Sequence, residues 1–448
     1  MHLTFVGHAQ LFAEAKGRHI FMDPWFHEPV FGHAWWRYPP SPFPEPETLP
    51  KIDLLLLSHA HPDHSGPRTL AKLDPATPTF APPFPSQVLE RRLARAGYTQ
   101  VTWAKFWQTY EPIAGVKVTF VPHNRGWEVA SLIVESDGVR LYHGNDNPLS
   151  VEAYQEIVQR LGPIDIAFLP FAGASSYPTC FDWSRQVMLQ MADKKKVEGI
   201  KRLTDGIEGL APKIAVPFAS NWALLEKSEL WRNFVDRPTP LQAADAAADF
   251  AKTRALPTKV LVLEPGDEWT AQGGKIEKKL VAQWGYDAAS IARYAAQVEE
   301  KVDAAHAERD LATSGVKPTA KILDAAVHTY FDAMIDKTIA GTADLKMLAG
   351  FVADGPEGGR WHLVFEPGKR PVVRSGAGPA VEDETLTVSD AELWSIVVGR
   401  ADWEDVWYGY RLRVKKRDGA GYYRSFWEMI LNFDSEAVAA TIRAAHAA

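Results

Sequence analysis

A short apolar run followed by a crowded polar loop constrains this chain more than any other feature. Residues 52–58 read IDLLLLS, as expected for a strand that other elements cover on both faces. Four ionisable residues follow within six positions, namely His59, His61, Asp63 and His64. His59 and His61 are two residues apart in an extended stretch, so both imidazoles can point the same way. Asp63 and His64 follow where the chain turns, so they can face a second point nearby.

This arrangement of side chains is typical of a metal site. A divalent metal ion needs several rigid nitrogen or oxygen ligands that converge on one point. Sites with two metal ions hold them about 3.5–4 Å apart, a separation that suits so compact a motif. We therefore predict a metal site at residues 59–64, rather than a solvated histidine-rich loop.

The rest of the first 265 residues alternates strand-like with helical patterns, which predicts an α/β architecture. Helical patterns occur at residues 85–96, 150–161 and 184–209. Strand-like runs occur at 3–6, 19–22, 79–81, 101–103, 116–122, 131–135, 139–143, 164–170 and 214–217.

A chain of 448 residues is too long for one ordinary core. We expect a metal-binding catalytic domain over residues 1–265 and a helical linker region over 266–350. Helical spacing begins at residue 288 and continues to about residue 353. The remainder, 351–448, returns to strand-like alternation around turns and predicts a smaller α+β domain.

Composition excludes several classes of protein. The 49 basic and 56 acidic residues argue against a nucleic-acid binder, which needs a basic surface. The single cysteine, Cys180, cannot form a disulfide within the chain or an iron–sulfur site. Because we find neither a signal-peptide pattern nor an apolar run of about 18 residues, we expect a cytoplasmic protein without a membrane span.

The pattern HxHxDH after a buried strand resembles the metallo-β-lactamase superfamily, and the resemblance extends over residues 1 to about 265. It implies an αββα sandwich that holds two divalent metal ions, which can be zinc, manganese or iron. Asp23, in the context FMDPW, matches an early aspartate that supports the histidine loop by hydrogen bonds. His123 matches the third histidine of the first metal position. Asp146, in YHGNDN, matches the aspartate that bridges both metals, although Asn145 interrupts the usual Gly-Asp order.

The resemblance thus implies two sets of ligands. His59, His61 and His123 would hold the first metal ion, and Asp63, His64 and Asp146 the second. The last histidine of the family is absent, because the strand KIAVP runs into residues 218–222, FASNW. The second position therefore has fewer protein ligands than usual, and an oxygen-rich set suits manganese or iron at least as well as zinc.

Two further resemblances concern the branch of the superfamily. Gly7-His8-Ala9 resembles the branch that contains ascorbate phosphate lactonase and the phospholipase that cleaves N-acylphosphatidylethanolamine. Residues 169–180 and 217–219 are similar to CMP-N-acetylneuraminate hydroxylase-like proteins, which combine this fold with iron and a Rieske module. One cysteine cannot build that module, so an oxygenase would need an external electron donor.

Three functions follow as hypotheses. The first is a hydrolase of an ester, lactone, amide or phosphoester bond in a small-molecule substrate, in which metal ions activate water and Asp63 orients or deprotonates it. The second is an iron oxygenase that uses the same ligands. The third is a metal-stabilised ligand-binding protein. His8 is a catalytic candidate as a proton donor, and a structural histidine at a strand end is the alternative.

The C-terminal part offers a weaker resemblance. Residues 383–393, DETLTVSDAEL, followed by a helix, resemble sterol-carrier-protein-like domains, which are small α/β folds with a hydrophobic cavity. A lid or a contribution to a homo-oligomer is the alternative for this part of the chain.

Overall fold

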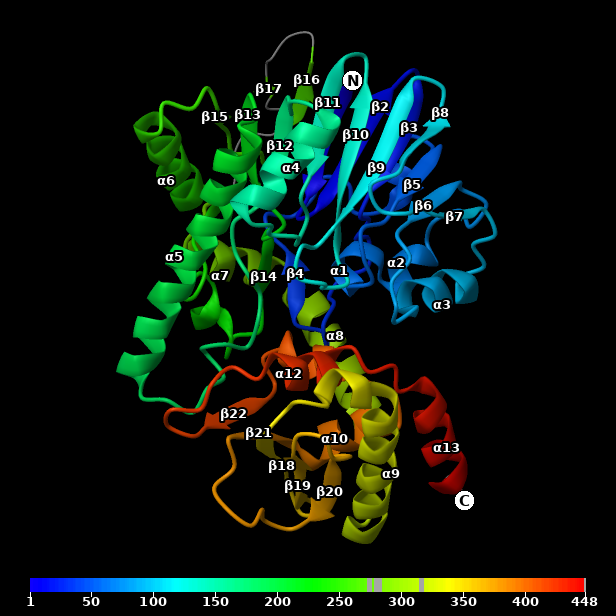
Figure 1. The fold of residues 1–448 in the computed structure, drawn as a ribbon, viewed down its shortest axis with the longest axis vertical. Helices are drawn as coiled ribbons and strands as arrows, with labels where there is room; N and C mark the ends of the chain where they lie inside the picture. The colour runs from blue at the N-terminus through cyan, green and yellow to red at the C-terminus, as the bar shows by residue number, and fades with distance from the viewer. Residues whose placement is uncertain (272–275, 278–283, 314–317, 447–448) are drawn as a thin grey trace. The chain divides into compact units, whose positions relative to one another are not determined.

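The structure is a computed structural model that describes residues 1–271, 276–277, 284–313 and 318–446. The chain divides into two compact units (Figure 1). The first unit comprises Met1–Val30, Trp35–Ala174 and Met191–Gln297, and the second comprises Phe31–Ala34, Ser175–Gln190 and Val298–Ala448. Two short segments of the N-terminal half therefore belong to the C-terminal unit.

The first unit contains two large sheets. One has the strand order β17-β16-β1-β2-β3-β5-β6-β7, and the other has the order β15-β13-β12-β11-β10-β9-β8. The first sheet consists of β1 (His2–Gly7), β2 (Gln10–Ala15), β3 (Arg18–Met22), β5 (Leu54–Leu56), β6 (Thr79–Ala81), β7 (Val101–Trp103), β16 (Glu268–Thr270) and β17 (Ile276–Glu277). The second consists of β8 (Thr109–Ile113), β9 (Val116–Pro122), β10 (Ala130–Ser136), β11 (Val139–His143), β12 (Ile166–Pro170), β13 (Ile214–Phe218) and β15 (Lys259–Val260).

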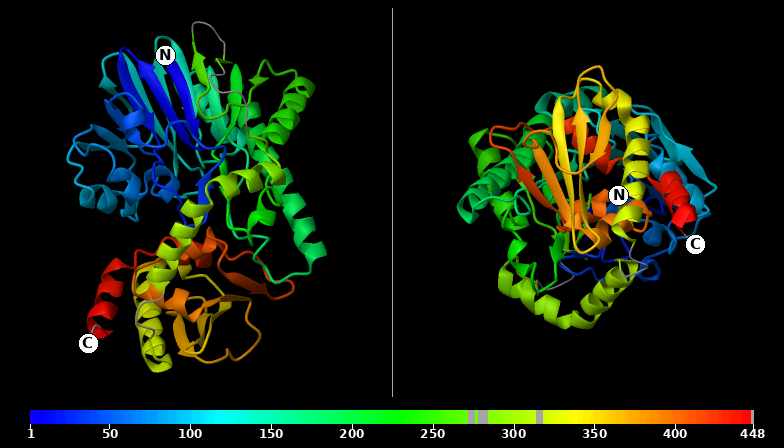
Figure 2. Two further views of the ribbon diagram at one scale, coloured as in Figure 1. Left: turned by 180° about the vertical axis from the view of Figure 1, so that it is seen from behind. Right: turned by 90° about the horizontal axis from the view of Figure 1, so that it is seen from below.

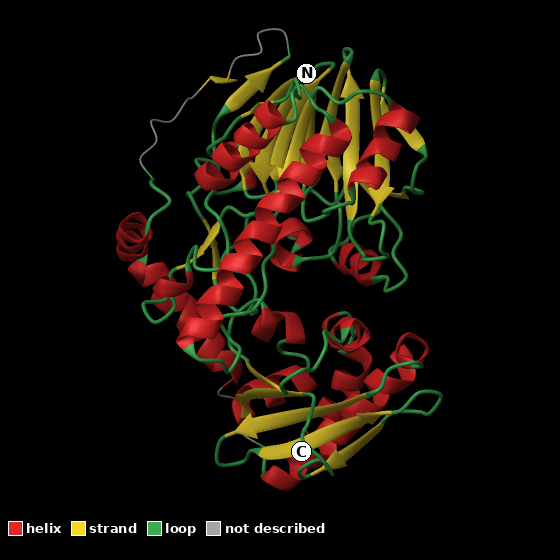
Figure 3. Cartoon of the chain, turned by 60° about the vertical axis from the view of Figure 1, so that its left-hand side comes forward, coloured by secondary structure: helices red, strands yellow, loops and turns green. Residues whose placement is uncertain are grey.

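Helices and a short strand pair complete this unit (Figure 3). β4 (Trp35–Arg37) and β14 (Trp222–Leu224) form an antiparallel pair. The helices are α1 (Pro62–Ser65), α2 (Pro67–Leu70), α3 (Val88–Arg95), α4 (Val151–Leu161), α5 (Arg185–Leu210), α6 (Pro240–Thr253) and α7 (Ala288–Gln297), with 3-10 turns at Pro46–Thr48 and Leu230–Arg232. α5 begins within the second unit and continues into the first.

The packing of these elements follows from alternation along the strands. In β9, Val118 and Phe120 join a core between the two sheets, while Val121 faces the opposite side. That opposite side packs on Tyr154 of α4 and Leu203 of α5. The outer face of the first sheet is covered in the same way by leucines of α2 and α3. Because successive side chains of a strand point to opposite faces, each sheet can be buried on both sides. The αββα sandwich predicted from the sequence is confirmed.

The second unit is an α+β structure around one mixed sheet of order β20-β19-β18-β21-β22. Only the β18–β21 pair is parallel, and α9 runs along the β20 edge (Figure 2, right). The strands are β18 (Met347–Asp354), β19 (Gly359–Phe365), β20 (Val372–Ser375), β21 (Glu384–Ser389) and β22 (Arg413–Lys416). The helices are α8 (Glu299–Thr313), α9 (Ala320–Thr338), a 3-10 turn at Ile339–Thr342, α10 (Asp390–Val397), α11 (Trp403–Trp407), α12 (Arg424–Leu431) and α13 (Glu436–His446).

The segment 175–190 is built into this second unit. Phe181 forms a bridge with Val414, and the Cys180 thiol, which is buried, donates to the Tyr410 carbonyl. Tyr177 packs against the apolar core of the unit. The similarity of this unit to sterol-carrier proteins stays a prediction.

Two local expectations were wrong. The N-terminus contains β2 between the two strands expected there, because residues 10–15 pair with strands on both sides. The helical pattern expected up to residue 353 ends earlier, since Met347–Asp354 forms the central strand β18 and pairs with β19 and β21. The predicted linker, 266–350, also includes residues 272–275, 278–283 and 314–317, which lie outside the described residues.

Within the described parts of the chain, no helix is long and apolar enough to cross a membrane.

Candidate metal centre

The polar cluster of the first unit lies where several strands end. His8 follows β1, Asp23 follows β3, the loop 58–65 follows β5, and Asp146 follows β11. Non-glycine residues with positive φ mark several of these strand ends, namely His8 (53°), Asp23 (48°), Asn145 (37°) and Ala219 (60°). Left-handed backbone is costly for such residues and gathers where function requires it.

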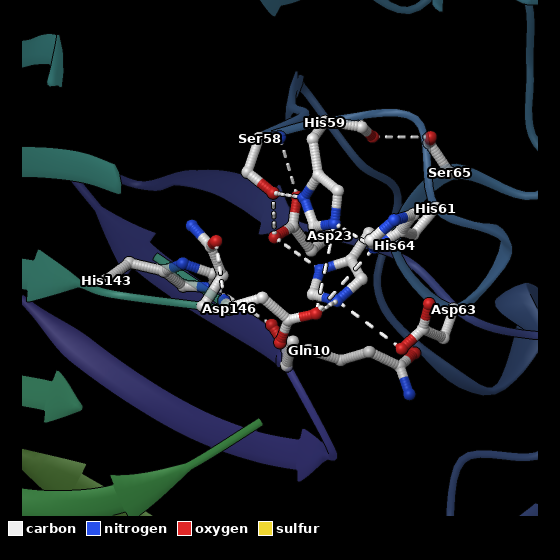
Figure 4. A network of polar contacts seen from close by, with 12 residues as sticks. Gln10, Asp23, Ser58, His59, His61, Asp63, His64, Ser65, His143 and Asp146 are labelled. Atoms are coloured by element: carbon white, nitrogen blue, oxygen red, sulfur yellow. Dashed lines mark hydrogen bonds and ion pairs between the residues drawn. The ribbon is translucent and has the colours of Figure 1, made fainter. Parts of the chain in front are cut away.

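His64 occupies the centre of the cluster (Figure 4). Its side chain is fully buried, and Nδ1 lies 2.9 Å from an oxygen of Asp23. Nε2 lies 3.4 Å from Oδ2 of Asp63 and 3.4 Å from Oδ2 of Asp146. The imidazole is therefore fixed from behind by one carboxylate, while its second nitrogen faces two others.

Asp146 connects the two halves of the histidine loop. Its Oδ2 lies 3.9 Å from Nε2 of His59 and 3.8 Å from Nδ1 of His61. The same oxygen lies 3.4 Å from Nε2 of His64. One carboxylate oxygen thus stands between two sets of imidazole nitrogens, as a bridging ligand would.

Asp23 and Ser58 support the loop from behind. Asp23 accepts hydrogen bonds from the Ser58 amide at 2.8 Å and from the Ser58 hydroxyl at 2.6 Å. Ser58 Oγ is also 2.8 Å from Nδ1 of His59. Hydrogen bonds of this kind fix the ring orientation of ligating histidines. Asp23 thus forms the hydrogen bonds to the histidine loop that the resemblance implied.

Asn145 explains how Asp146 is held despite the interrupted Gly-Asp order. Its side chain donates to the Ala130 carbonyl at 2.6 Å and accepts from the Asp146 amide at 2.6 Å. Asparagine tolerates the left-handed conformation better than most residues. Asn145 therefore takes the place of the flexible glycine and also adds two hydrogen bonds to the loop.

His8 lies on the other side of Asp63. It is 1% exposed, and its Nε2 is 2.8 Å from Oδ2 of Asp63. The ring meets Trp25 edge to face, with 5.2 Å between centroids. From the sequence, His8 could have either a catalytic or a structural role. In the structure its side chain is part of the cluster.

His59 and His64 are both buried, but their surroundings shift the pKa values of their imidazoles in opposite directions. Burial, together with the charges of His64 and His61, lowers the pKa of His59 well below its usual value. Burial works in the same direction at His64, but the carboxylates of Asp63 and Asp146 outweigh it and raise the pKa of His64 well above its usual value. The Asp63 pKa lies well below its usual range because His64 and His8 outweigh the effect of burial. The surroundings of His64 therefore favour positive charge.

Among the described residues there are three groups of three side chains that could hold a metal ion, and within each group the ligand atoms lie within 4.8 Å of one another. They are His8, His64 and Asp146; Asp23, His59 and His64; and His59, His61 and Asp146. Two buried atoms at this site make no hydrogen bond. They are Nε2 of His64, which belongs to two of the groups, and Oδ1 of the neighbouring Asp63. Such buried polar atoms are rare in proteins and call for an explanation. A divalent cation fits this donor set of imidazoles and carboxylates.

His123 stands apart from these groups. It is buried at the end of β9, its Nδ1 accepts from the Arg125 amide at 3.0 Å, and its ring stacks on Trp127 at 4.6 Å. With Nδ1 engaged in this way, ligation would fall to Nε2. Its part in the first metal position stays a prediction.

Sequence reasoning missed three polar residues that shape the cluster. Ser58 and Asn145 position the histidine loop and Asp146, and Gln10 lies beside the cluster (Figure 4). Gln10 is fully buried and accepts from the Trp25 amide at 3.0 Å, while its Nε2 has no hydrogen-bond partner. The available signal was a polar residue inside an otherwise apolar strand or at its end, which is weak without a structure.

Known proteins are similar to parts of this chain. Residues 18–206 match the model of the beta-lactamase superfamily domain. The cytidine monophosphate-N-acetylneuraminic acid hydroxylase of Xenopus laevis is 28% identical over 49% of this chain and 38% of its own length. A metal-dependent hydrolase of Pyrococcus abyssi is 26% identical over 59% of this chain and 97% of its own. Among solved structures, the diiron beta-hydroxylase CmlA from Streptomyces venezuelae matches 58% of this chain and 53% of its own at 18% identity, with a TM-score of 0.41. This chain thus spans about two fifths of the length of the Xenopus hydroxylase.

Proposed function

We propose that this protein is a metal-dependent hydrolase with two divalent metal ions. The match of residues 18–206 to the beta-lactamase superfamily domain supports this proposal. Zinc, manganese and iron are the candidate metals. The substrate is a small molecule with an ester, lactone, amide or phosphoester bond. The Pyrococcus relative, matched over 97% of its length, is named a metal-dependent hydrolase and supports this choice.

The observation that carries the proposal is the position of Asp146. Its Oδ2 lies within 3.9 Å of nitrogens of His59, His61 and His64. A carboxylate oxygen in this position would suit a pair of ions about 3.5–4 Å apart. His59, His61 and His123 would hold one ion, and Asp63, His64 and Asp146 the other.

The residues of this chain would act around those ions as follows. Divalent ions held here lower the pKa of water toward neutrality and polarise a substrate oxygen. Asp63 Oδ1 is buried and makes no hydrogen bond, so it is placed to accept a hydrogen bond from an attacking water and then its proton. His8 Nε2 lies 2.8 Å from the other Asp63 oxygen, so its imidazole is close to the residues proposed for the second metal position.

Elemental analysis and a hydrolysis screen test the proposal together. We expect protein purified without added metal to contain zinc, manganese or iron, and to hydrolyse at least one member of a panel of esters, lactones, amides and phosphodiesters. Asp63→Ala should lower kcat/KM by about three orders of magnitude or more, since it removes a metal ligand and the base together. Protein that binds no metal, or an Asp63→Ala variant with full activity, would contradict the proposal. Wild-type protein that contains metal but hydrolyses no member of the panel, together with an Asp63→Ala variant that binds ligand as the wild type does, would favour a metal-stabilised ligand-binding protein.

An iron oxygenase is the second candidate. Two observations favour it: the 28% identity to the Xenopus hydroxylase, and the absence of a histidine in residues 218–222 after β13. In that case an external donor would supply electrons. Iron in the purified protein, with oxygen uptake that depends on substrate, would decide for the oxygenase. Zinc or manganese without oxygen uptake would decide against it.

A further inference from the structure

The second metal position has a gap at the end of β13. In the resemblance drawn from the sequence, the last ligand of that position is a histidine after a late strand. Here β13 ends at Phe218, and Ala219, Ser220 and Asn221 follow. Asp63, His64 and Asp146 alone would leave the second ion with three protein ligands, two of them carboxylates.

The backbone of His8 lies next to this gap. The Ala219 amide donates a hydrogen bond to the His8 carbonyl at 3.3 Å. Both residues have positive φ, 53° at His8 and 60° at Ala219. His143 Nε2 donates a hydrogen bond to the Ala9 carbonyl at 2.9 Å, so the His8-Ala9 turn is connected to the second sheet as well. The turn after β1 therefore reaches the place from which the missing histidine would come.

The side chain of His8 points at the ligands of the second position. Its Nε2 is 2.8 Å from Oδ2 of Asp63, and that oxygen is 3.4 Å from Nε2 of His64. Two ligands about 2.1 Å from a shared ion are at most about 4.2 Å apart, so both distances allow a common ion. His8, His64 and Asp146 also form one of the three groups of ligand atoms in the described part of the chain.

We infer that His8 is the fourth protein ligand of the second metal position and replaces the histidine that is absent after β13. This inference rests on the proposed two-metal function. It gives the second ion two imidazole nitrogens from His8 and His64 and two carboxylate oxygens from Asp63 and Asp146. His8 gives up its hydrogen bond to Asp63 when the ion binds, because the nitrogen that ligates a metal must be unprotonated.

Metal titration of the full-length protein tests the inference without depending on activity. Metal-free protein is titrated with Co²⁺, and bound metal is counted by elemental analysis and by visible absorption. The informative variant is His8→Gln, which keeps a hydrogen-bond donor toward Asp63 and a similar volume but replaces the imidazole. The matched control is His2→Ala, which removes a histidine at the opposite end of β1 that is partly exposed and pairs with Glu268.

We expect two ions for the wild type and for His2→Ala. His8→Gln should bind the first ion as the wild type does and the second at least about tenfold more weakly. Two ions bound by His8→Gln with wild-type affinity would overturn the inference and leave the proposed function standing. If activity then fell in that variant, His8 would be a proton donor instead. Wild-type protein that binds no Co²⁺ would overturn both.

A second measurement covers the case in which His8→Gln fails to fold. A crystal structure of the Co²⁺-loaded wild type should show a His8 nitrogen about 2.0–2.2 Å from the second ion. A second ion coordinated by Asp63, His64 and Asp146, with His8 only hydrogen-bonded to Asp63, would overturn the inference.

Discussion

At the scale of single residues, the candidate metal centre depends on the side chains that position the proposed ligands as much as on those ligands. Asp23 is fully buried and accepts from the amide and hydroxyl of Ser58, and it also binds Nδ1 of His64. One carboxylate thereby fixes both the start of the histidine loop and the ring of its central histidine. Supporting residues of this kind contribute strongly to metal affinity.

Asp23→Asn should therefore weaken metal binding while the fold is kept. The asparagine amide cannot accept from Ser58 and His64 as a carboxylate does, so the His64 ring loses its orientation. We expect the metal affinity to fall by about 10–100-fold, measured by competition with a chelator of known affinity.

Asp53→Asn is the matched control for this variant. Asp53 also accepts from a strand amide, that of His19, and pairs with Arg18 at a partly exposed position. Its metal affinity should equal that of the wild type. An Asp23→Asn protein with unchanged affinity would show that Asp23 does not orient the ligands.

At the scale of elements, the centre depends on how the strand ends are brought together. β11 and β12 pair in parallel, and Gly144 follows β11 directly before Asn145 and Asp146. The Gly144 amide donates to the Phe168 carbonyl at 2.8 Å. A Cβ at this position would lie 2.6 Å from that carbonyl oxygen and 3.0 Å from the Tyr142 ring. The turn that carries Asp146 can approach β12 this closely only with glycine.

Gly144→Ala should accordingly move the Asp146 turn. We expect a loss of about 1–3 kcal/mol in the free energy of unfolding, since buried backbone must shift, together with weaker metal binding. Chemical denaturation and metal titration measure the two effects. Gly421→Ala, where an added Cβ meets nothing within 4 Å, should change neither. Wild-type metal affinity in Gly144→Ala would mean that Asp146 does not depend on this close approach.

At the scale of the whole molecule, the candidate metal centre and the C-terminal sheet belong to different compact units. All candidate ligands lie in the first unit, while the second has its own apolar core and its own sheet. Segments 31–34 and 175–190 are part of the second unit, so a cut between residues 297 and 298 would remove part of its packing. Tyr177 and Phe181 of segment 175–190 pack against that core.

Metal removal should consequently act on one unit. A ligand that binds only the folded state stabilises it by about 2.7 kcal/mol at a free concentration of 100 times its Kd. We expect chelation to accelerate hydrogen exchange in β1, β3, β5 and β11 and to leave β18–β22 unchanged, as measured by mass spectrometry of peptic fragments. Equal acceleration in both units, or none in the first, would contradict this expectation.

Elements with strong local patterns could be predicted from the amino-acid sequence. The run at 52–58 predicted β5, and the other strands and helices that were predicted for residues 1–265 have nearly the bounds expected, because alternation and helical spacing are local properties. The HxHxDH motif predicted the clustering of His59, His61, Asp63 and His64, since four such residues in six positions must lie close together. Asp23 and Asp146 were predicted to belong to the site only from the resemblance to the metallo-β-lactamase superfamily.

Other features depend on contacts between segments that are distant in the sequence. Residues 347–354 form a strand because β19 and β21 pair with them on both sides, although their local pattern favoured a helix. His8 reaches Asp63, 55 positions away, and Asn145 holds the Asp146 turn through a carbonyl of β10. No spacing along the chain encodes these contacts, because they arise where strands distant in sequence end at the same edge of a sandwich.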